Sequence, residues 1–128
     1  MANKISKKNK QIKIVPKARV HIKSSFNNTL ISASDEKGNV FAWSSTGRAG
    51  FKGTKKSTPY ASTQAARIVV DKILEAQTKE IEIFVAGVSS GRDAAIRAFG
   101  SIGVRINGIK DITPIPHNGC RPKKPRRV

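Results

Sequence analysis

Residues 44–57 combine glycines with basic side chains, the two residue types that a phosphate-binding loop needs. Glycines let backbone N–H groups approach a phosphate closely, and lysine or arginine supplies the opposite charge. The glycines are Gly47, Gly50 and Gly53, and the basic residues are Arg48, Lys52, Lys55 and Lys56. A Walker A nucleotide loop would require Gly-Lys-Ser/Thr, which this segment lacks. A flexible surface loop is the plain alternative, but loops of this length are usually functional, so we expect contact with an RNA or DNA backbone.

A second candidate anion site lies at residues 87–93, which lead from an expected strand into an expected helix. The free N–H groups and the positive dipole at a helix N-terminus favour an anion, and Arg92 is placed to reinforce that charge. Asp93 opposes it, because its carboxylate occupies the same end of the helix. Ser90 and Asp93 also resemble a capping box, with Asp in place of the usual Glu. An anion site and an ordinary capped helix both remain open here.

Most of the positive charge lies at the two ends of the chain. The 128 residues include 25 Lys and Arg but only 8 Asp and Glu, which gives a formal net charge of +17. Neither residues 1–23 nor residues 117–128 contain an acid, and four of the six prolines follow residue 113, which favours an extended chain. We expect residues 1–16 and 113–128 to be basic tails that become ordered on a nucleic acid, the alternative being tails that only confer solubility. The basic residues of the last twelve positions are Arg121, Lys123, Lys124, Arg126 and Arg127.

Composition also argues against several other classes of protein. The longest apolar run, residues 83–86, is far shorter than a membrane-spanning helix requires, and no apolar stretch typical of a secretory signal follows the Lys-rich start. The single cysteine, Cys120, excludes an internal disulfide and a cysteine-cluster zinc site. His21 and His117 have no acid near them in the sequence, so no catalytic arrangement stands out. We therefore expect no enzymatic activity, no cofactor, metal or small-molecule substrate, and no membrane contact.

The hydropathy pattern predicts five strands and two helices in the order β-β-β-α-β-α-β. Ala18, Val20 and Ile22 alternate with polar residues as in a half-buried strand, and Thr58-Pro59 gives a helix its N-cap and first residue. A slip in phase at Asn107-Gly108 indicates a β-bulge in the last strand. The expected strands are residues 18–23, 29–33, 40–43, 80–85 and 104–112, and the expected helices are residues 59–74 and 90 to about 103. We expect one α/β domain over residues 17–112, with its first three strands forming an antiparallel meander.

The same order of elements occurs in ribonuclease-H-like nucleases, which hold two metal ions with carboxylates. The first of those carboxylates lies on the opening strand, where this chain has Arg19, His21 and Lys23 instead. Asp71 and Glu75 lie one turn apart on the first expected helix and, as a lone pair, indicate a solvated face or ion-pair partners. We therefore expect the ribonuclease-H-like fold, with a mixed five-stranded sheet, but without the carboxylates that nuclease activity requires.

Three sequence blocks resemble the family of the eleventh protein of the small ribosomal subunit, in its bacterial form. They are Ser-Phe-Asn-Asn-Thr at residues 25–29, Gly-Phe-Lys-Gly-Thr-Lys-Lys-Ser-Thr-Pro-Tyr-Ala at residues 50–61, and Thr-Pro-Ile-Pro-His-Asn-Gly-Cys-Arg-Pro at residues 113–122. The similarity runs from about Val20 to Val128. The chain departs from the family at residues 87–92, where Gly-Val-Ser-Ser-Gly-Arg replaces the usual Gly-Pro-Gly-x-Gly-Arg, and at Pro125, which is displaced from its usual place.

The resemblance implies a ribonuclease-H-like α/β fold without nuclease carboxylates, and a structural role in a ribosome of the cytoplasm or of an organelle. Members of the family sit on the platform of the small subunit, bridge helices of the 16S-type rRNA and help form the cleft where mRNA pairs with the rRNA 3′ end. Their neighbours are small-subunit proteins seven and eighteen, and initiation factor three binds nearby. These are the partners that the resemblance implies for this chain.

Matching the family's motifs to this chain implies a set of rRNA-contacting residues. They lie in the first turn, in the glycine loop, at the start of the second helix and in the C-terminal tail: Asn27, Asn28, Arg48, Lys52, Lys55, Lys56, Arg92, His117, Asn118, Arg121, Lys123, Lys124, Arg126 and Arg127. A basic nucleic-acid chaperone or duplex-binding module outside the ribosome is the alternative function. Comigration with small subunits at moderate salt separates the two.

Overall fold

The computed structural model describes residues 14–127 and confirms the expected order of elements. The bounds are β1 (Lys17–Ser24), β2 (Thr29–Ser34), β3 (Val40–Ser45), a 3-10 turn η1 (Gly53–Ser57), α1 (Pro59–Glu75), β4 (Glu80–Ala86), α2 (Ser90–Gly100) and β5 (Arg105–Asp111). The glycine-rich segment is therefore less irregular than expected, because its first two residues belong to β3 and its last five to η1.

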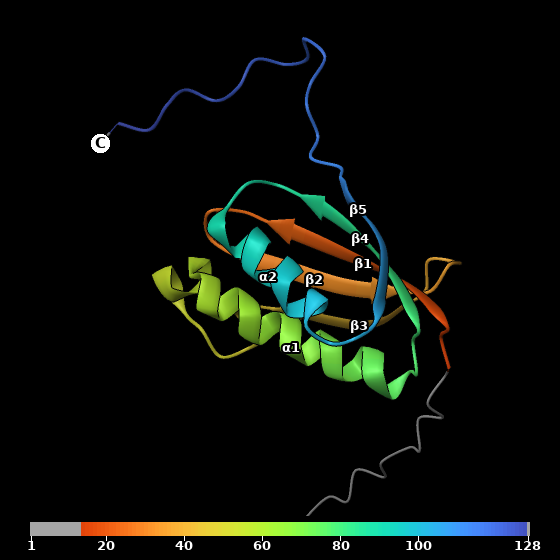
Figure 1. Cartoon of the computed structure of the whole chain (residues 1–128). Coiled ribbons are helices and arrows are strands. Elements are labelled where there is room, and N and C mark those ends of the chain that lie inside the picture. The colour runs from red at the N-terminus through yellow and green to blue at the C-terminus, as the bar shows by residue number, and fades with distance from the viewer. Residues whose placement is uncertain (1–13, 128) are drawn as a thin grey trace, which may run out of the picture.

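The strands form one mixed five-stranded sheet in the order β3-β2-β1-β4-β5. The first three strands are the predicted antiparallel meander, and β4 and β5 add to it in parallel with β1. Both helices lie on the same face of this sheet, as Figure 1 shows. This is the expected ribonuclease-H-like α/β arrangement, and no helix of residues 14–127 lies on its other sheet face.

The core lies between the sheet and the two helices, as the residue pattern predicts. Along β1, Ala18, Val20 and Ile22 are buried while the residues between them are exposed. The apolar spacing of Ala65, Val69 and Ile73 predicts a buried stripe on α1 that also includes Leu74; the stripe is buried from Ala65 to Ile73, but Leu74 is 51% exposed. Phe99 of α2 is fully buried and completes the core.

Local signals explain several element boundaries. Thr58 caps α1, because its side-chain hydroxyl accepts from the backbone N–H of Ala61 at 3.3 Å, and Pro59 follows at the first helical position, as expected. The register between β4 and β5 shifts at Ile81/Glu82, which confirms a bulge at the predicted Asn107-Gly108 step.

The prediction of a capping box formed by Ser90 and Asp93 at the start of α2 is wrong. The N-cap is Ser89, Ser90 is already helical, and no side chain caps the helix. The Ser89 hydroxyl instead contacts the hydroxyl of Ser24 at the end of β1. The helix ends at Gly100, earlier than the expected Gly103, which lies in the following loop with a positive φ of 74°. A tertiary contact has replaced the local cap.

The folded domain begins before Lys17, the boundary that the sequence predicts. Val15 is buried, and its N–H donates to the carbonyl of Ala76 at 3.0 Å. The carbonyl of Pro16 accepts from the N–H groups of Lys79 and Glu80. The remainder of the expected N-terminal tail, residues 1–13, lies outside the described residues. At the C-terminal end, residues 114–127 contain no helix or strand, and this tail extends away from the domain (Figure 1).

Candidate nucleic-acid interface

The topology brings the expected binding segments to one end of the sheet. Because β1, β4 and β5 are parallel, their carboxyl ends share one edge, and β2 begins and β3 ends at that same edge. We call this region the loop end and define it as residues 25–28, 46–58 and 87–89 together with the base of the C-terminal tail at residues 112–113. Segments far apart in the sequence therefore form one continuous surface.

Charge is unequally divided between the two ends of the domain. The far end holds the β2–β3 turn, the end of α1 and the start of β4. It carries Asp35, Glu36, Asp71, Glu75 and Glu80. Of the eight acids in the chain, only Asp93 and Asp111 lie at the starts or ends of elements that border the loop end. The loop end thus faces solvent with an excess of positive charge.

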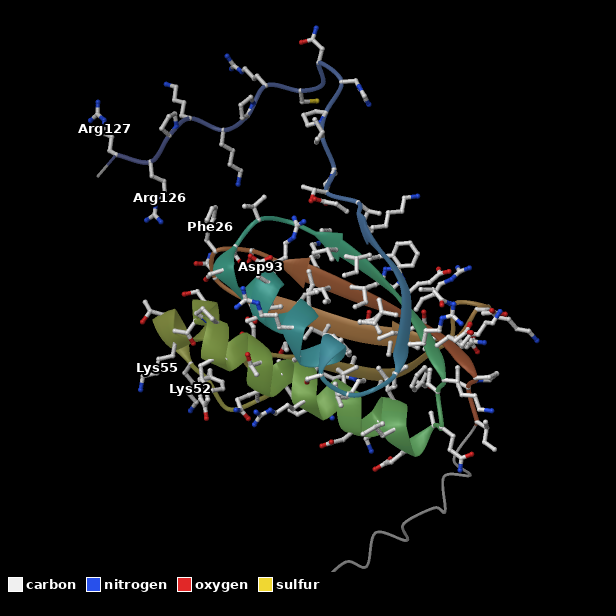
Figure 2. The ribbon with its side chains drawn as sticks, viewed as in Figure 1. Phe26, Lys52, Lys55, Asp93, Arg126 and Arg127 are labelled. Atoms are coloured by element: carbon white, nitrogen blue, oxygen red, sulfur yellow. The ribbon has the colours of Figure 1, made fainter. Side chains whose placement is uncertain are left out.

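The glycine-rich segment presents its basic side chains from a backbone that is tied down. The N–H groups of Ala49 and Phe51 donate to the carbonyls of Ser45 and Thr46 at 3.0 and 3.2 Å. Lys52 and Lys55 are exposed and Lys56 is partly buried. Figure 2 shows the Lys52 and Lys55 side chains beside the start of α1. These observations favour a positioned cationic loop over a flexible one.

Arg48 is held against the edge strand of the sheet. Its guanidinium carbon lies 4.2 Å from the centre of the Trp43 ring, and its Nη1 donates to the Trp43 carbonyl at 3.4 Å. Its backbone N–H donates to the Ser45 hydroxyl at 3.1 Å. Cation–π contact of this kind fixes an arginine while leaving its other donors available to an acceptor such as a phosphate oxygen.

The two asparagines of the first turn differ in their surroundings. The Asn28 side-chain oxygen accepts from the N–H of Thr29 at 2.8 Å and from the Thr46 hydroxyl, which ties the β1–β2 turn to the glycine-rich segment. The oxygen is therefore already used, and the amide nitrogen is the group of Asn28 that remains for a ligand. Asn27 is exposed at the tip of the same turn.

Buried hydroxyls fasten the loop end to the domain. Ser24 contacts Ser89 across the β1 and β4 ends, and the hydroxyls of Thr29 and Ser62 lie 3.0 Å apart. Gly91 packs directly over the second pair, because a Cβ placed there would lie 2.3 Å from the Ser62 oxygen. The turn between β4 and α2 is thereby held close to the sheet.

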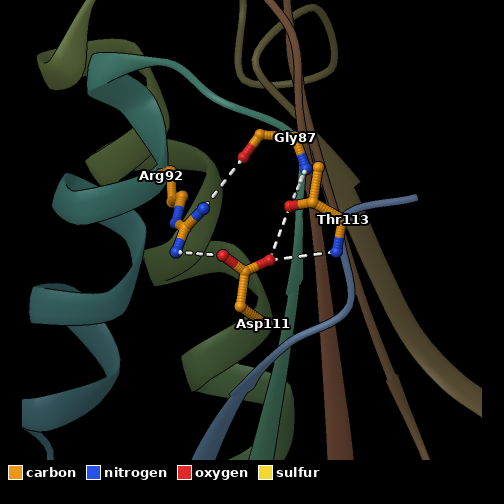
Figure 3. A network of polar contacts seen from close by, with 4 residues as sticks. All are labelled: Gly87, Arg92, Asp111 and Thr113. Carbon is orange, nitrogen blue, oxygen red and sulfur yellow. Dashed lines mark hydrogen bonds and ion pairs between the residues drawn. The ribbon is translucent and has the colours of Figure 1, made fainter. Parts of the chain in front are cut away.

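Arg92 is used inside the protein, in a network that joins three segments (Figure 3). Its guanidinium donates to the Asp111 carboxylate at 2.9 Å and to the Gly87 carbonyl at 3.1 Å. The Gly87 N–H in turn donates to the Thr113 hydroxyl at 3.1 Å. Arg92 therefore positions the turn and the base of the tail, and the start of α2 lacks the free arginine that an anion site there would use. Contact between Arg92 and rRNA stays a prediction.

The carboxyl group of Asp111 is tuned by this network. The Thr113 hydroxyl and the Thr113 backbone N–H both donate to it, at 2.5 and 2.9 Å, and the Arg92 guanidinium adds a hydrogen bond and an opposite charge. Together they lower the pKa of Asp111 from 3.8 to about 2, with the Thr113 hydroxyl as the largest cause. The ionised form is the one that holds the base of the tail.

Neutralising Asp111 is expected to change how stability depends on pH. A carboxyl whose pKa is lower in the folded state stabilises the fold above its ordinary pKa of 3.8, and that contribution is lost as the pH falls toward 2. The stability difference between the wild type and Asp111→Asn should therefore shrink from pH 5 to pH 2 in thermal unfolding. Asp71→Asn, which removes one exposed acid from α1, controls for net charge. A difference that stays constant over this range would contradict the assigned network.

Exposed aromatic side chains lie at the loop end and on the adjoining first turn of α1, and the sequence pattern does not predict them. Phe26 is 79% exposed in the first turn, where Figure 2 shows it extending away from the sheet. Tyr60 is 65% exposed, and its ring meets that of Phe51 edge to face with centroids 5.8 Å apart. A phenylalanine next to the Asn27-Asn28 turn signal was the available clue, because a turn gives such a ring nothing to pack against.

The tail residues are not brought together with the loop end. The predicted contacts there are all exposed: His117, Asn118, Arg121, Lys123, Lys124, Arg126 and Arg127. Within residues 114–127 no side chain or backbone group forms a hydrogen bond with the domain, and Figure 2 shows Arg126 and Arg127 well away from it. The tail is thus available to a partner along its whole described length.

Two further findings bear on the class of protein. Over residues 14–127, no group of three or more His, Cys, Asp or Glu side chains is arranged to hold a metal ion. No helix in that part of the chain has the length and apolarity needed to cross a membrane.

Comparison with known families shows a match over most of the chain. The family model described as ribosomal protein S11 matches residues 18–127, which include the domain from β1 onward and the basic tail. Members of this family are structural, rRNA-binding proteins of the small ribosomal subunit. The fold and the cationic loop end are consistent with this match. Because the match covers most of the sequence, the chain belongs to the ribosomal protein S11 family.

Proposed function

We propose that the loop end and the C-terminal tail bridge helices of 16S-type rRNA on the platform of the small subunit. The observation that carries this proposal is the division of charge within the domain. The topology gathers Arg48, Lys52, Lys55 and Lys56 at one end, next to the exit of a tail with five more basic residues, while most acids lie at the other end. Phosphate contacts of this kind fix position and orientation on RNA.

The domain and the tail have different tasks in this proposal. The loop end is pre-ordered by its backbone hydrogen bonds and buried hydroxyls, so it offers a surface of fixed shape to folded RNA. The tail makes no hydrogen bonds with the domain over residues 114–127, so it can follow the groove between two RNA helices. His117 and Asn118 add donors and acceptors that discriminate more than charge does. A protein that bridges two RNA helices needs two RNA-binding parts that are covalently linked but bind at different places, and the loop end and the tail meet this requirement.

The remaining expectations follow from the family resemblance and belong to the same proposal. A platform protein of this kind would help form the cleft where mRNA pairs with the rRNA 3′ end. Its neighbours would be small-subunit proteins seven and eighteen, with initiation factor three nearby. The chain acts in the ribosome, which we propose to be that of the cytoplasm or of an organelle.

Sedimentation of a lysate tests the platform protein against a free nucleic-acid chaperone. The full chain should comigrate with small subunits through a gradient at moderate salt, and it should not exchange onto added duplex RNA. A Lys52→Ala, Lys55→Ala, Lys56→Ala variant should be incorporated less, whereas Lys37→Ala, Lys72→Ala, Lys79→Ala removes the same charge from the far end and should be incorporated normally. Release of the wild type into the light fractions at moderate salt would instead support the chaperone.

A further inference from the structure

The face of the sheet without helices presents a row of residues, one from each strand. The register places Trp43, Ser32, His21, Phe84 and Lys110 side by side from β3 to β5. Because alternate residues of β1 and β4 are buried under the helices, the members of this row point to the opposite side. None of them lies in the loop end or the tail.

The row is partly aromatic. The rings of His21 and Phe84 are stacked on each other, with centroids 5.1 Å apart and an angle of 16° between their planes, so each ring has one face left for a ligand. Trp43 is 56% exposed and is covered in part by the Arg48 guanidinium. Beside Phe84, the bulge at Asn107-Gly108 leaves an open hollow of about 340 Å³, which Lys110 also lines. A hollow of this size is in the range that holds small ligands.

The charge on this face matches a polyanion. Lys17, Arg19 and Lys23 lie on the exposed side of β1. Arg105 and Lys110 lie across β4 from them, paired in register with Glu80 and Phe84. The acids of the face are Glu80 and Glu82, so basic side chains outnumber acidic ones around the aromatic row. Glu82 lines the hollow, where its carboxylate can accept from the amino or imino group of a base.

We propose that unpaired RNA nucleotides bind this face, with their bases stacked on the Trp43–His21–Phe84 row and their phosphates near Lys23 and Lys110. The proposal rests on the RNA-binding function and adds a second type of contact to it. Stacking on aromatic rings of a sheet is the established way in which proteins hold single-stranded RNA, and it needs planar bases as well as charge. An acidic protein segment would satisfy the charge but would leave the free ring faces of His21 and Phe84 without a matching planar partner.

The single tryptophan makes this face directly observable. Trp43 is the only tryptophan in the chain, so intrinsic fluorescence reports on the surroundings of Trp43, which are this face and the Arg48 guanidinium over the ring. The probes are a six-nucleotide oligouridylate and an abasic ribose-phosphate oligomer of equal length, titrated into the full chain at constant salt. We expect the oligouridylate to quench Trp43 and to bind at least about fivefold more tightly than the abasic oligomer, since each stacked base adds that much or more.

Substitutions separate stacking from charge. Phe84→Leu keeps the apolar bulk and should remove most of the oligouridylate's advantage without changing the affinity for the abasic oligomer. Tyr60→Leu, which removes an exposed aromatic ring outside this face, should leave the Trp43 signal unchanged. Lys23→Ala, which removes a charge next to the proposed phosphate positions, should weaken both probes equally. The unfolding midpoint of each variant is measured as a control for folding. If Phe84→Leu does not fold, the difference in affinity between the two probes for the wild type tests whether bases stack on this face.

Two outcomes would overturn the proposal. One is equal binding of the oligouridylate and the abasic oligomer, which would mean that only charge acts on this face. The other is that a polyglutamate peptide quenches Trp43 as strongly as the oligouridylate, which would indicate an acidic protein partner. Either result would leave comigration with small subunits intact, so failure of this proposal is distinguishable from failure of the proposed function.

Discussion

Replacing Gly87 with alanine is expected to leave little or no folded protein. Gly87 has a φ of 91°, and a Cβ built there would lie 1.8 Å from the backbone carbonyl oxygen of Ser24. That oxygen belongs to the central strand and cannot rotate away, so the β4–α2 turn would have to move. The same movement would break the bonds of Gly87 to Thr113 and Arg92. We expect a loss of more than about 3 kcal/mol in the free energy of unfolding.

The matched control for this substitution is Gly38→Ala. Gly38 has nearly the same φ, 92°, but a Cβ there would meet no atom within 4 Å. It should therefore show only the cost of the backbone conformation, about 1 kcal/mol. Urea unfolding of both variants measures the difference. Equal losses for the two glycines would show that backbone strain alone matters and that the close approach at Ser24 does not.

Removing residues 117–128 is expected to abolish stable incorporation into small subunits while leaving the domain folded. No buried residue is lost, because every described residue of that segment is exposed. The segment does carry Arg121, Lys123, Lys124, Arg126 and Arg127, five of the residues expected to contact phosphates. Far-ultraviolet circular dichroism and a thermal scan report on the fold, and sedimentation with small subunits reports on incorporation.

The contribution of the tail to rRNA binding can be measured from the salt dependence of the binding constant. If about ten basic side chains of the full chain neutralise phosphates, the slope of log K against log salt for an rRNA fragment should be about −7 to −9. Without the five basic residues of the tail, the slope should become shallower by about 3.5 to 4.5. If truncation leaves the slope unchanged, the tail does not contact phosphates. If the slope of the full chain is shallower than about −3, the basic residues of the loop end do not contact phosphates either.

Stiffness of the tail can be separated from its charge. Pro122→Gly with Pro125→Gly keeps every basic residue and therefore the salt slope, but it increases the conformational entropy that the tail loses on binding. We expect weaker incorporation of this variant than of the wild type. Normal incorporation would show that charge alone is sufficient.

Much of the fold could be predicted because the relevant signals are local. The alternation of Ala18, Val20 and Ile22 marks a strand with one buried face, and the phase slip at Asn107-Gly108 marks a bulge, since both effects act on adjacent residues. The cap at Thr58 was predictable for the same reason. The cap expected at Ser90 was wrong because Ser89 contacts Ser24, which is 65 residues away in the sequence.

The candidate site was less predictable than the fold. The sequence marks the basic residues of the glycine-rich segment, and the topology that places them beside the first turn and the base of the tail follows from the predicted order of strands. The partners of Arg92 and Asn28 could not be foreseen, because Asp111 and Thr46 reach them only after the sheet has formed. The aromatic row across five strands likewise depends on the register of each strand pair.

Lysine reactivity in assembled small subunits tests most directly whether the loop end and the tail face the rRNA. Acylation of free and incorporated protein, followed by mass spectrometry, gives the protection of each lysine. We expect strong protection of Lys52, Lys55, Lys56, Lys123 and Lys124 on incorporation. Lys37 and Lys79, at the far end of the same domain, should stay as reactive as in the free protein. Protection of the far-end lysines with the loop-end lysines left reactive would contradict the orientation on which the proposed function depends.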